Sequence, residues 1–432
     1  MDDRLSALSD DLLRRILHFV PLKEAASTSV LSRRWGSLWR SPGAVNLAVR
    51  VHGSKERGNA AFFSRRDAFV RAAQAALDAA EAPVTRLTLR VDTGKSHANI
   101  GHFLRRSRES DAVGAVLSHR AARRVEHLRV ALADADHDAC GFSDREVERD
   151  MGIYDLVSLP ASATLRVLDL TRCDLALWSR GAAAAAFPRL ATLRLRLCSV
   201  KTKDLQALLD AAPELATVHL DSVLFTRHRN STPYQYQRVD EFHGNTTAAE
   251  LPVVGLSFRA VTVLVLALCG QNQKDRHGAG SWALEIDAPK LRSLEYKGIL
   301  RRFLLKSPAP DMERVDLHIL HDRGIHNVYY ENKGTTTKRA LFWQFLHNFT
   351  NVRALKLKVD YDLKDIAVVG TARRVKLLCA FPGAERLELE GVHRPTSKTE
   401  KSGAAVSTGR GLQLQLPWSA AGQILRGQCH GS

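Results

Sequence analysis

The sequence of 432 residues predicts an α/β protein in which three short N-terminal helices are followed by an irregular solenoid of parallel strands. Two patterns carry this prediction. The first forty residues place large apolar side chains at helical spacing, and an apolar triplet with the spacing L-x-x-L-x-L recurs ten times further along the chain. With 45% hydrophobic and 25% charged residues, the composition is that of an ordinary folded protein.

The first predicted helix starts after Ser9 and ends before Pro21. Ser9 is positioned to cap it, and Asp10 and Asp11 place negative charge at the positive end of its dipole. Pro21 ends the helix because its nitrogen carries no proton to donate. The apolar residues between these ends follow a helical period: Leu12, Leu13, Ile16, Leu17 and Val20.

Two more short helices are expected before residue 40. One covers roughly residues 23 to 29, and the next begins after Ser32 with Trp35, Leu38 and Trp39 on one face. Three helices of this size bury too little surface to fold alone, so their apolar side chains need a cover. The periodic pattern is compatible with two ways to bury these side chains, against the rest of the same chain or against a separate partner.

The residues of this segment carry a resemblance. The order Leu8-Ser9-Asp10, Leu12-Leu13, Ile16-Leu17, Pro21, Val30-Leu31-Ser32-Arg33-Arg34-Trp35 and Leu38-Trp39 resembles the F-box, and VLSRRW is typical of its plant versions. Family members commonly have Pro in place of Ser9 and often Glu in place of Asp11. The resemblance implies that residues 1–45 bind a Skp-family adaptor, and through it a cullin. It assigns the contacts to Leu5, Leu8, Leu12, Leu13, Ile16, Leu17, Pro21, Leu22, Val30, Leu31, Trp35, Leu38 and Trp39.

Residues 46–83 are expected to connect this segment to the solenoid. The string AVNLAVRV, after the break at Pro42 and Gly43, has the composition of a strand. A helix follows, marked by Phe69, Ala73 and Ala76, and it ends before Pro83.

Residues 84–393 carry the repeats. The copies are Val84/Leu87/Leu89, Val125/Leu128/Val130, Leu165/Leu168/Leu170, Leu190/Leu193/Leu195, Leu215/Val218/Leu220, Val261/Leu264/Leu266, Leu291/Leu294/Tyr296, Met312/Val315/Leu317, Val352/Leu355/Leu357 and Ala384/Leu387/Leu389. Their spacings cluster near one or two units of a leucine-rich repeat of about 20–29 residues. Each copy therefore predicts one strand of a parallel-stranded horseshoe whose leucines point inward.

The C-terminal repeats carry a second resemblance. The strings FWQFLHNFTNVRALKLKVDYDLKDIAVV and LLCAFPGAERLELEGVH are similar to the leucine-rich region that precedes the FBD domain of plant F-box proteins. Beyond His393 that pattern fails, which indicates an FBD part that is truncated or replaced. Residues 394–432 are polar and expected to be disordered. Leu412, Leu414 and Leu416 alternate there as in a last edge strand.

A net charge of +17 raises the question of nucleic-acid binding. Residues 1–50 contribute +3 and residues 394–432 contribute +4, so the remaining +10 is spread over the middle of the chain. A dispersed excess favours a solvated surface over a specific nucleic-acid site. No apolar run reaches membrane-spanning length and the N-terminus has no signal-peptide pattern, so we expect a cytoplasmic or nuclear protein without membrane contact.

The sequence indicates no catalytic, cofactor or metal site. It lacks G-x-S-x-G and phosphate-loop motifs and has no C-x-x-C pair. Cys173, Cys198 and Cys269 fall three residues after a repeat triplet, where leucine-rich repeats bury Asn or Cys. Cys140, Cys379 and Cys429 are scattered. His318 and His321 have the spacing of a weak ligand pair but lie on a strand, so packed or exposed histidines are expected there.

The remaining candidate is a binding surface on the repeats. Residues between the inward leucines face the other side of the strands, which places a row of basic side chains there: Arg86, Arg90, Arg129, Arg194, Arg196, Lys356 and Lys358. The two resemblances imply a non-catalytic substrate receptor of an SCF-type ubiquitin ligase, with the repeats binding the protein target. The alternative is a basic repeat scaffold that binds nucleic acid or acidic proteins without ligase function. The identity of the target stays open.

Overall fold

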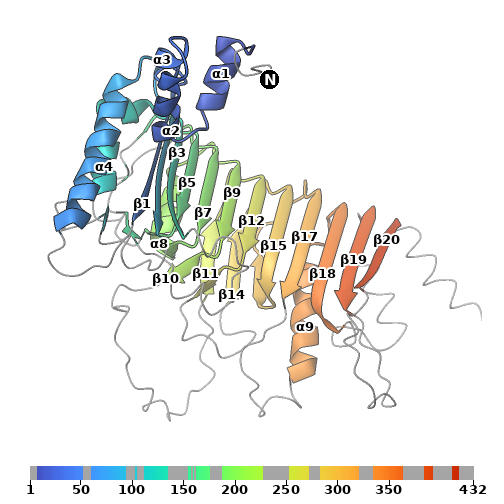
Figure 1. The fold of residues 1–432 in the computed structure, drawn as a ribbon. Helices are drawn as coiled ribbons and strands as arrows, with labels where there is room; N and C mark the ends of the chain where they lie inside the picture. The colour runs from blue at the N-terminus through green and yellow to red at the C-terminus, as the bar shows by residue number, and fades with distance from the viewer. Residues whose placement is uncertain are drawn as a thin grey trace, which may run out of the picture. The chain divides into compact units, whose positions relative to one another are not determined.

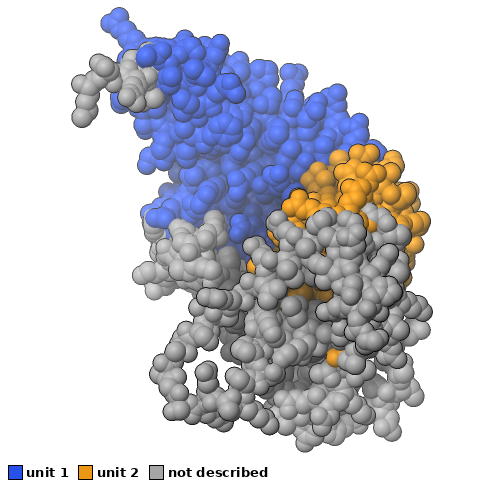
Figure 2. Space-filling model, turned by 90° about the vertical axis from the view of Figure 1, so that its right-hand side faces the viewer, with its two compact units in different colours: residues 1–215, 219–229 blue, residues 216–218, 230–432 orange. Residues whose placement is uncertain are grey.

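A computed structural model shows how these elements fold. It describes residues 7–51, 60–93, 103–104, 111–134, 154–156, 159, 162–175, 187–226, 253–271, 283–320, 334–362, 384–392 and 411–417. The chain divides into two compact units, drawn in blue and orange in Figure 2. Unit 1 comprises residues 1–215 and 219–229, and unit 2 comprises residues 216–218 and 230–432.

Unit 1 begins with the three short helices that the sequence predicts (Figure 1). They are α1 (Asp10–Leu17), α2 (Leu22–Ser27) and α3 (Trp35–Leu38), with a 3-10 turn at Thr28–Val30 after α2. The Ser9 side chain caps α1 as predicted, because its Oγ accepts a hydrogen bond of 3.4 Å from the Leu12 amide. The first helix is therefore set by its local sequence.

The front sheet of unit 1 contains β1 (Ala44–Val51), β2 (Arg86–Thr93), β3 (His127–Asp134), β5 (Val167–Thr171), β7 (Thr192–Arg196) and β9 (Thr217–Asp221), in that order. The pairs from β1 to β7 are parallel. A back sheet contains β4 (Tyr154–Asp155), β6 (Cys173–Asp174), β8 (Ser199–Lys201) and β10 (Leu224–Thr226). The described helices of this part are α4 (Ala60–Ala79), α6 (Ala112–Leu117) and α8 (Thr202–Asp210), with a 3-10 turn at Arg120–Arg124.

Leucines stack from strand to strand because the register repeats without a shift. Leu87, Leu128, Leu168 and Leu193 are successive partners in the ladder, and all four are buried. The residues that alternate with them face away from this core and are half-buried or exposed. The period-two pattern that the triplets predict is thus what gives each strand one inner and one outer face.

A left-handed residue follows each short front strand in this region. Arg172, Leu197 and Ser222 have φ of 60°, 53° and 54°, and Leu268 of unit 2 has φ of 53°. At the first three positions the chain turns from a front strand into a back strand. The amide of Leu197 donates to the Asp221 carbonyl at 2.9 Å, so the turn stays tied to the next repeat. A left-handed conformation is costly for residues with a side chain, and the repeated tertiary environment holds it here.

The front sheet of unit 2 contains β12 (Val263–Ala267), β15 (Ser293–Ile299), β17 (Arg314–Leu320), β18 (Ala354–Asp362) and β19 (Arg386–Val392), all parallel. β20 (Gly411–Pro417) adds to β19 in the antiparallel direction. The back sheet of unit 2 contains β11 (Val253–Ser257), β14 (Ala283–Asp287) and β16 (Arg302–Leu305). Helix α9 (Gly334–His347) contacts β16, and a short strand β13 covers Gly270–Gln271.

The predicted fold class is confirmed. Each of the ten predicted triplets coincides with a front strand, and the AVNLAVRV segment forms β1. The alternating leucines near the C-terminus form β20, whereas residues 393–410 and 418–432 lie outside the described residues. The two back sheets have no counterpart in the sequence prediction. Strands β4, β6, β8 and β10 have only two or three residues, which is too few to show a period.

Candidate functional site

The N-terminal helical segment, residues 7–42, has a hydrophobic core of its own. Leu13, Leu17, Ala25, Trp35 and Leu38 are buried together, and Leu8, Val20 and Trp39 pack against them. The three helices meet there because each presents its periodic apolar residues to the other two. An exposed ion pair adds to this packing, since Arg34 Nε lies 2.7 Å from Asp10 Oδ1 and so connects the start of α1 to the approach to α3.

A second set of apolar side chains in this segment faces solvent. In the described part of the chain eight large apolar side chains are exposed, and five of them belong to these helices: Leu12, Ile16, Phe19, Val30 and Leu31. Their exposed fractions lie between 45% and 85%. Leu12 and Ile16 are four residues apart and therefore lie on one face of α1. Such a concentration of exposed apolar surface marks an interaction site.

The adaptor-binding residues predicted from the sequence divide between core and surface. Leu13, Leu17, Trp35 and Leu38 are buried, Leu8, Leu22 and Trp39 are half-buried, Leu12, Ile16, Pro21, Val30 and Leu31 are exposed, and Leu5 lies outside the described residues. Phe19 was missed by the sequence prediction. Its position three residues after Ile16 and seven after Leu12 was the signal that could have identified it.

The helical segment is attached to the first repeat strand by hydrogen bonds. Asn46 on β1 donates from Nδ2 to the carbonyls of His18 and Val20, at 2.8 and 3.2 Å. The His18 ring pairs through Nδ1 with the Pro42 carbonyl at 2.8 Å. On β2, the Arg86 guanidinium lies over the Phe19 ring. These contacts hold the exposed face of the helices in a defined orientation on the first strands of unit 1.

Burial at this attachment also affects a histidine. His127 on β3 is the register partner of Arg86. Burial lowers the pKa of His127 below its usual value of 6.5, and the positive charge of Arg86 lowers it further. The imidazole is therefore neutral next to the guanidinium at neutral pH.

The outer side of the front sheet in unit 1 carries charges of alternating sign. Asp169 on β5 is the register partner of Arg129 on one side and of Arg194 on the other. The Arg129 Nε lies 3.5 Å from an Asp169 oxygen, and Arg196 Nε lies 3.5 Å from Asp221. The predicted basic row thus exists, but carboxylates from neighbouring strands divide it.

The same alternation occurs in unit 2. Lys356 Nζ lies 3.6 Å from Glu388, and Lys358 Nζ lies 2.6 Å from Glu390, each on the neighbouring strand β19. The hydrogen bond to Glu390 raises the pKa of Lys358 above its usual value, although burial opposes the shift. Both lysines are therefore occupied by partners within the sheet.

The seven candidate target-binding residues differ in availability. Arg90 pairs with Asp92 on its own strand at 2.8 Å, and Arg86 is half-buried at the Phe19 contact. Arg194 is exposed and forms no ion pair with any residue that the structure describes. Of the seven, Arg194 is the guanidinium best placed to meet a partner.

Two cysteines of unit 1 are buried in the repeats, where a packing role suits them better than a reactive one. Cys173 and Cys198 are buried, unlinked thiols in consecutive repeats, which confirms the predicted burial of both. The Cys198 Sγ donates to the carbonyls of Arg196 and Leu170, at 3.3 and 3.4 Å. A hydrogen bond with Cys198, followed by burial, raises the pKa of Cys173 well above that of a free thiol. The Cys173 thiol therefore stays protonated and is not a reactive thiolate.

Cys269, which the sequence predicts to be buried in the same way, is only half-buried. Cys140, Cys379, Cys429 and His321 lie outside the described residues. Within the residues described, no three His, Cys, Asp or Glu side chains are grouped to hold a metal ion. Over the same residues, no helix is both long and apolar enough to cross a bilayer.

Comparison with known families agrees with this arrangement. Residues 5–44 match the F-box domain, and residues 131–297 match the leucine-rich repeats described for FBD-associated F-box protein At5g56370. The first match covers the three helices with their exposed apolar face. The second covers strands of both front sheets, from the end of β3 to β15.

Three relatives from Arabidopsis thaliana show how the similarity is distributed. F-box/LRR-repeat protein At3g58940 is 23% identical over 410 residues, which are 93% of this chain and 57% of that protein. FBD-associated F-box protein At5g60610 is 60% identical over 38 residues, 9% of this chain and 10% of that protein. F-box/FBD/LRR-repeat protein At4g26340 is 62% identical over 37 residues, 9% of each chain. This chain therefore spans little more than half of the first relative, and the short alignments to the other two show much higher identity.

Proposed function

We propose that this chain, which carries an F-box domain and leucine-rich repeats of the FBD-associated type, is the substrate-recognition subunit of an SCF-type ubiquitin ligase. Proteins of this build are in general non-catalytic adaptors, and an F-box in general binds a Skp-family protein. In the proposal the F-box docks on such an adaptor, which is joined to a cullin. The repeats bind a protein target in the cytoplasm or nucleus.

The observation that carries the proposal is the exposed apolar face of the F-box. The helices already have a buried core, and Leu12, Ile16 and Val30 lie outside it with much of their surface exposed. Burying a large apolar side chain stabilises a complex by about 1.5–3 kcal/mol. An adaptor that covers this face would gain that stabilisation at several positions at once.

The proposed mechanism is one of position. A receptor that binds target and adaptor together raises the effective concentration of the target near the ubiquitin-conjugating enzyme, so a bimolecular transfer becomes local. The hydrogen bonds from Asn46 to the end of α1 support this role, because they fix the F-box on the strands that begin the repeats. No bond-making step is assigned to this chain.

For the target, the proposal favours an acidic or phosphorylated segment bound at the outer side of the front sheet of unit 1. Arg194 supports this choice because it is exposed and has no ion pair among the described residues. A guanidinium binds carboxylate or phosphate oxygens in a bidentate way that a lysine does not reproduce. The neighbouring Arg129 and Arg196 already form ion pairs with Asp169 and Asp221, so a target would have to displace these carboxylates to bind them.

Co-purification with a Skp-family adaptor tests the F-box half of the proposal. The double substitution Leu12→Ser, Ile16→Ser should weaken adaptor binding at least about tenfold, because it removes two exposed apolar contacts. Val253→Ser, a change at an exposed apolar residue of unit 2, is the matched control and should bind like the unsubstituted protein. Equal binding by the double variant and the control would contradict the proposal.

Proteins that co-purify with the intact receptor and are lost from an Arg194→Glu variant would identify the target.

A further inference from the structure

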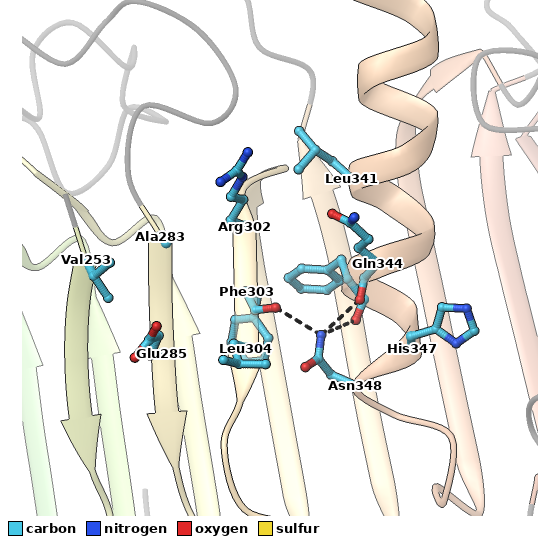
Figure 3. A pocket seen from close by; sticks show the side chains of 11 residues that line it. Val253, Ala283, Glu285, Arg302, Phe303, Leu304, Leu341, Gln344, His347 and Asn348 are labelled. Atoms are coloured by element: carbon cyan, nitrogen blue, oxygen red, sulfur yellow. Dashed lines mark hydrogen bonds between the residues drawn. The ribbon is translucent and has the colours of Figure 1, made fainter. Parts of the chain in front are cut away.

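Unit 2 contains a hollow between its back sheet and helix α9 (Figure 3). Its volume is about 700 Å³, within the range of ligand-binding clefts. The described lining comes from β11, β14 and β16 on one side and from α9 on the other, and these residues belong to unit 2. None of them belongs to the F-box helices or to a front strand.

The floor of this hollow is aromatic and tightly packed. The ring centroids of Phe303 and Phe345 are 5.1 Å apart, and Phe349 lies within 5.7 Å of both. All three rings are almost fully buried. Packing of this kind gives the hollow a fixed apolar base.

Asn348 joins the two walls. Its Nδ2 donates at 3.0 Å to the carbonyls of Phe303, Gln344 and Phe345, and its Oδ1 accepts from the Leu305 amide at 2.9 Å. One side chain thus connects the end of α9 to strand β16, as the dashed lines in Figure 3 show in part. The hollow is therefore preformed and does not depend on a partner to bring its walls together.

Two apolar side chains of the lining remain exposed. Val253 and Leu304 are 45% and 49% exposed. Among the described residues only one other large apolar side chain outside the F-box, Leu268, is exposed. Exposed apolar residues gathered around a concave surface indicate an interaction site more strongly than the same residues scattered singly.

The charge at the rim is positive. Glu285 is the one acidic residue in the described part of the lining, and it is paired with Lys306, whose Nζ lies 2.7 Å from its oxygen. Arg302 is exposed and has no ion pair in the part of the chain that the structure describes. A bound group would therefore meet an uncompensated guanidinium next to an apolar surface.

A second hollow of about 260 Å³ shares His347 and Asn348 with the first and continues to Asn351. The two hollows adjoin at these residues, and their described linings include residues from β11 to those that follow α9. Two adjoining open hollows suit a length of polypeptide better than a compact small molecule, which needs enclosure on most sides.

We propose that the two hollows form one groove, lined by Val253, Leu304, Phe345 and Arg302 among others, which binds an acidic, apolar segment of a partner protein. One or two apolar side chains of the segment rest on Val253 and Leu304, and a carboxylate next to them pairs with Arg302. The positive net charge of the chain attracts such a segment from a distance. The proposal does not depend on ligase function.

Two synthetic peptides of about fifteen residues test the groove. Both carry leucines at helical spacing, and the other positions are Glu in one and Lys in the other. Fluorescence anisotropy with the full-length protein should show binding of the Glu peptide and about tenfold weaker binding after Leu304→Ser or Arg302→Glu. Arg302→Glu should in turn strengthen binding of the Lys peptide.

Matched variants separate the groove from general effects. Arg259→Glu changes the net charge by the same amount at an exposed residue outside the lining, so it should leave binding of the Glu peptide within about threefold. Leu12→Ser should leave it unchanged, which excludes the F-box face as the binding site. Thermal unfolding confirms that each variant is folded.

Two results would overturn the proposal. One is equal weakening by Arg302→Glu and Arg259→Glu, which would mean that the peptide responds to net charge alone. The other is absence of peptide binding together with a Leu304→Cys thiol that does not react with a maleimide. That pair of results would show that another segment of this chain already covers the groove.

Discussion

The guanidinium carbon of Arg86 lies 5.1 Å from the ring centroid of Phe19, which connects the second strand of unit 1 to the end of the first F-box helix. A cation over an aromatic ring at an exposed site contributes about 0.5–1 kcal/mol. The contact places Arg86, a candidate for target binding in the sequence, at the base of the F-box. It also leaves most of the Phe19 ring exposed, next to the face proposed for the adaptor.

Leu12 and Leu13 are neighbours with opposite roles. Leu13 is fully buried in the F-box core, so Leu13→Ala should destabilise unit 1 by about 2–5 kcal/mol. Leu12 is exposed, so Leu12→Ala should change stability by no more than about 0.5 kcal/mol and yet weaken adaptor binding. Denaturant unfolding and adaptor titration of both single variants measure the two effects. Similar loss of stability in both would show that Leu12 is a core residue.

Asn46 is expected to determine how firmly the F-box is attached. Asn46→Ala leaves the carbonyls of His18 and Val20 without their side-chain donor, which costs about 1–3 kcal/mol if water does not replace it. The loss should appear as a lower midpoint of thermal unfolding. Lys203→Ala, at an exposed residue of the same unit, is the control and should stay close to the unsubstituted protein. A midpoint equal to that of the control would show that solvent replaces the amide.

His127 should make unit 1 less stable in mild acid. Its pKa in the folded protein lies below 6.5, while the unfolded chain binds the proton at about 6.5. As the pH falls below 6.5 the unfolded state gains a proton that the folded state does not, so stability is lost until the folded pKa is passed. His127→Gln should reduce the difference in unfolding midpoint between pH 7.5 and pH 5.5. His347→Gln, at an exposed histidine, is the control, and an equal difference in both variants would exclude His127 as the cause.

Arg194 and Arg196 should differ in target binding. Arg194→Glu removes an exposed guanidinium that has no ion pair among the described residues and places a carboxylate next to Asp169, so recovery of an acidic target should fall about tenfold or more. Arg196→Glu mainly disrupts the pair with Asp221 and should have the smaller effect. Adaptor binding should be the same in both. Unchanged target recovery with Arg194→Glu would place recognition elsewhere on the repeats.

Nucleic-acid binding should be weak and insensitive to sequence. The basic side chains of the front sheets are largely paired with carboxylates, which reduces the number of phosphates that they can neutralise. Association with DNA or RNA should therefore disappear as salt rises to physiological concentration, measured by anisotropy with two unrelated oligonucleotides. Sequence-selective binding that persists at that salt would favour the alternative of a nucleic-acid scaffold.

The sequence by itself determined the strands of both front sheets and the start of the first helix. Leu87, Leu89 and their equivalents alternate with polar residues, and the β-strand is the regular structure whose side chains alternate between two faces with this period. Ser9 caps the helix by accepting a hydrogen bond from Leu12, three residues away, so its capping role also depends only on local sequence. These are short-range properties, and they hold wherever the rest of the chain lies.

Only the tertiary structure decided which residues are core and which are surface in the F-box. Leu12 and Leu13 are both apolar, and the packing of Trp35 and Leu38 against one of them buries Leu13 and leaves Leu12 to solvent. Alternation along the strands already places Arg196 and Asp221 on the same side of the sheet, but they are 25 positions apart and only the register of two strands pairs them. The groove next to Leu304 brings together β11 and α9, which are distant in the chain. Such contacts depend on how elements pack in space, and local patterns of residues do not contain that information.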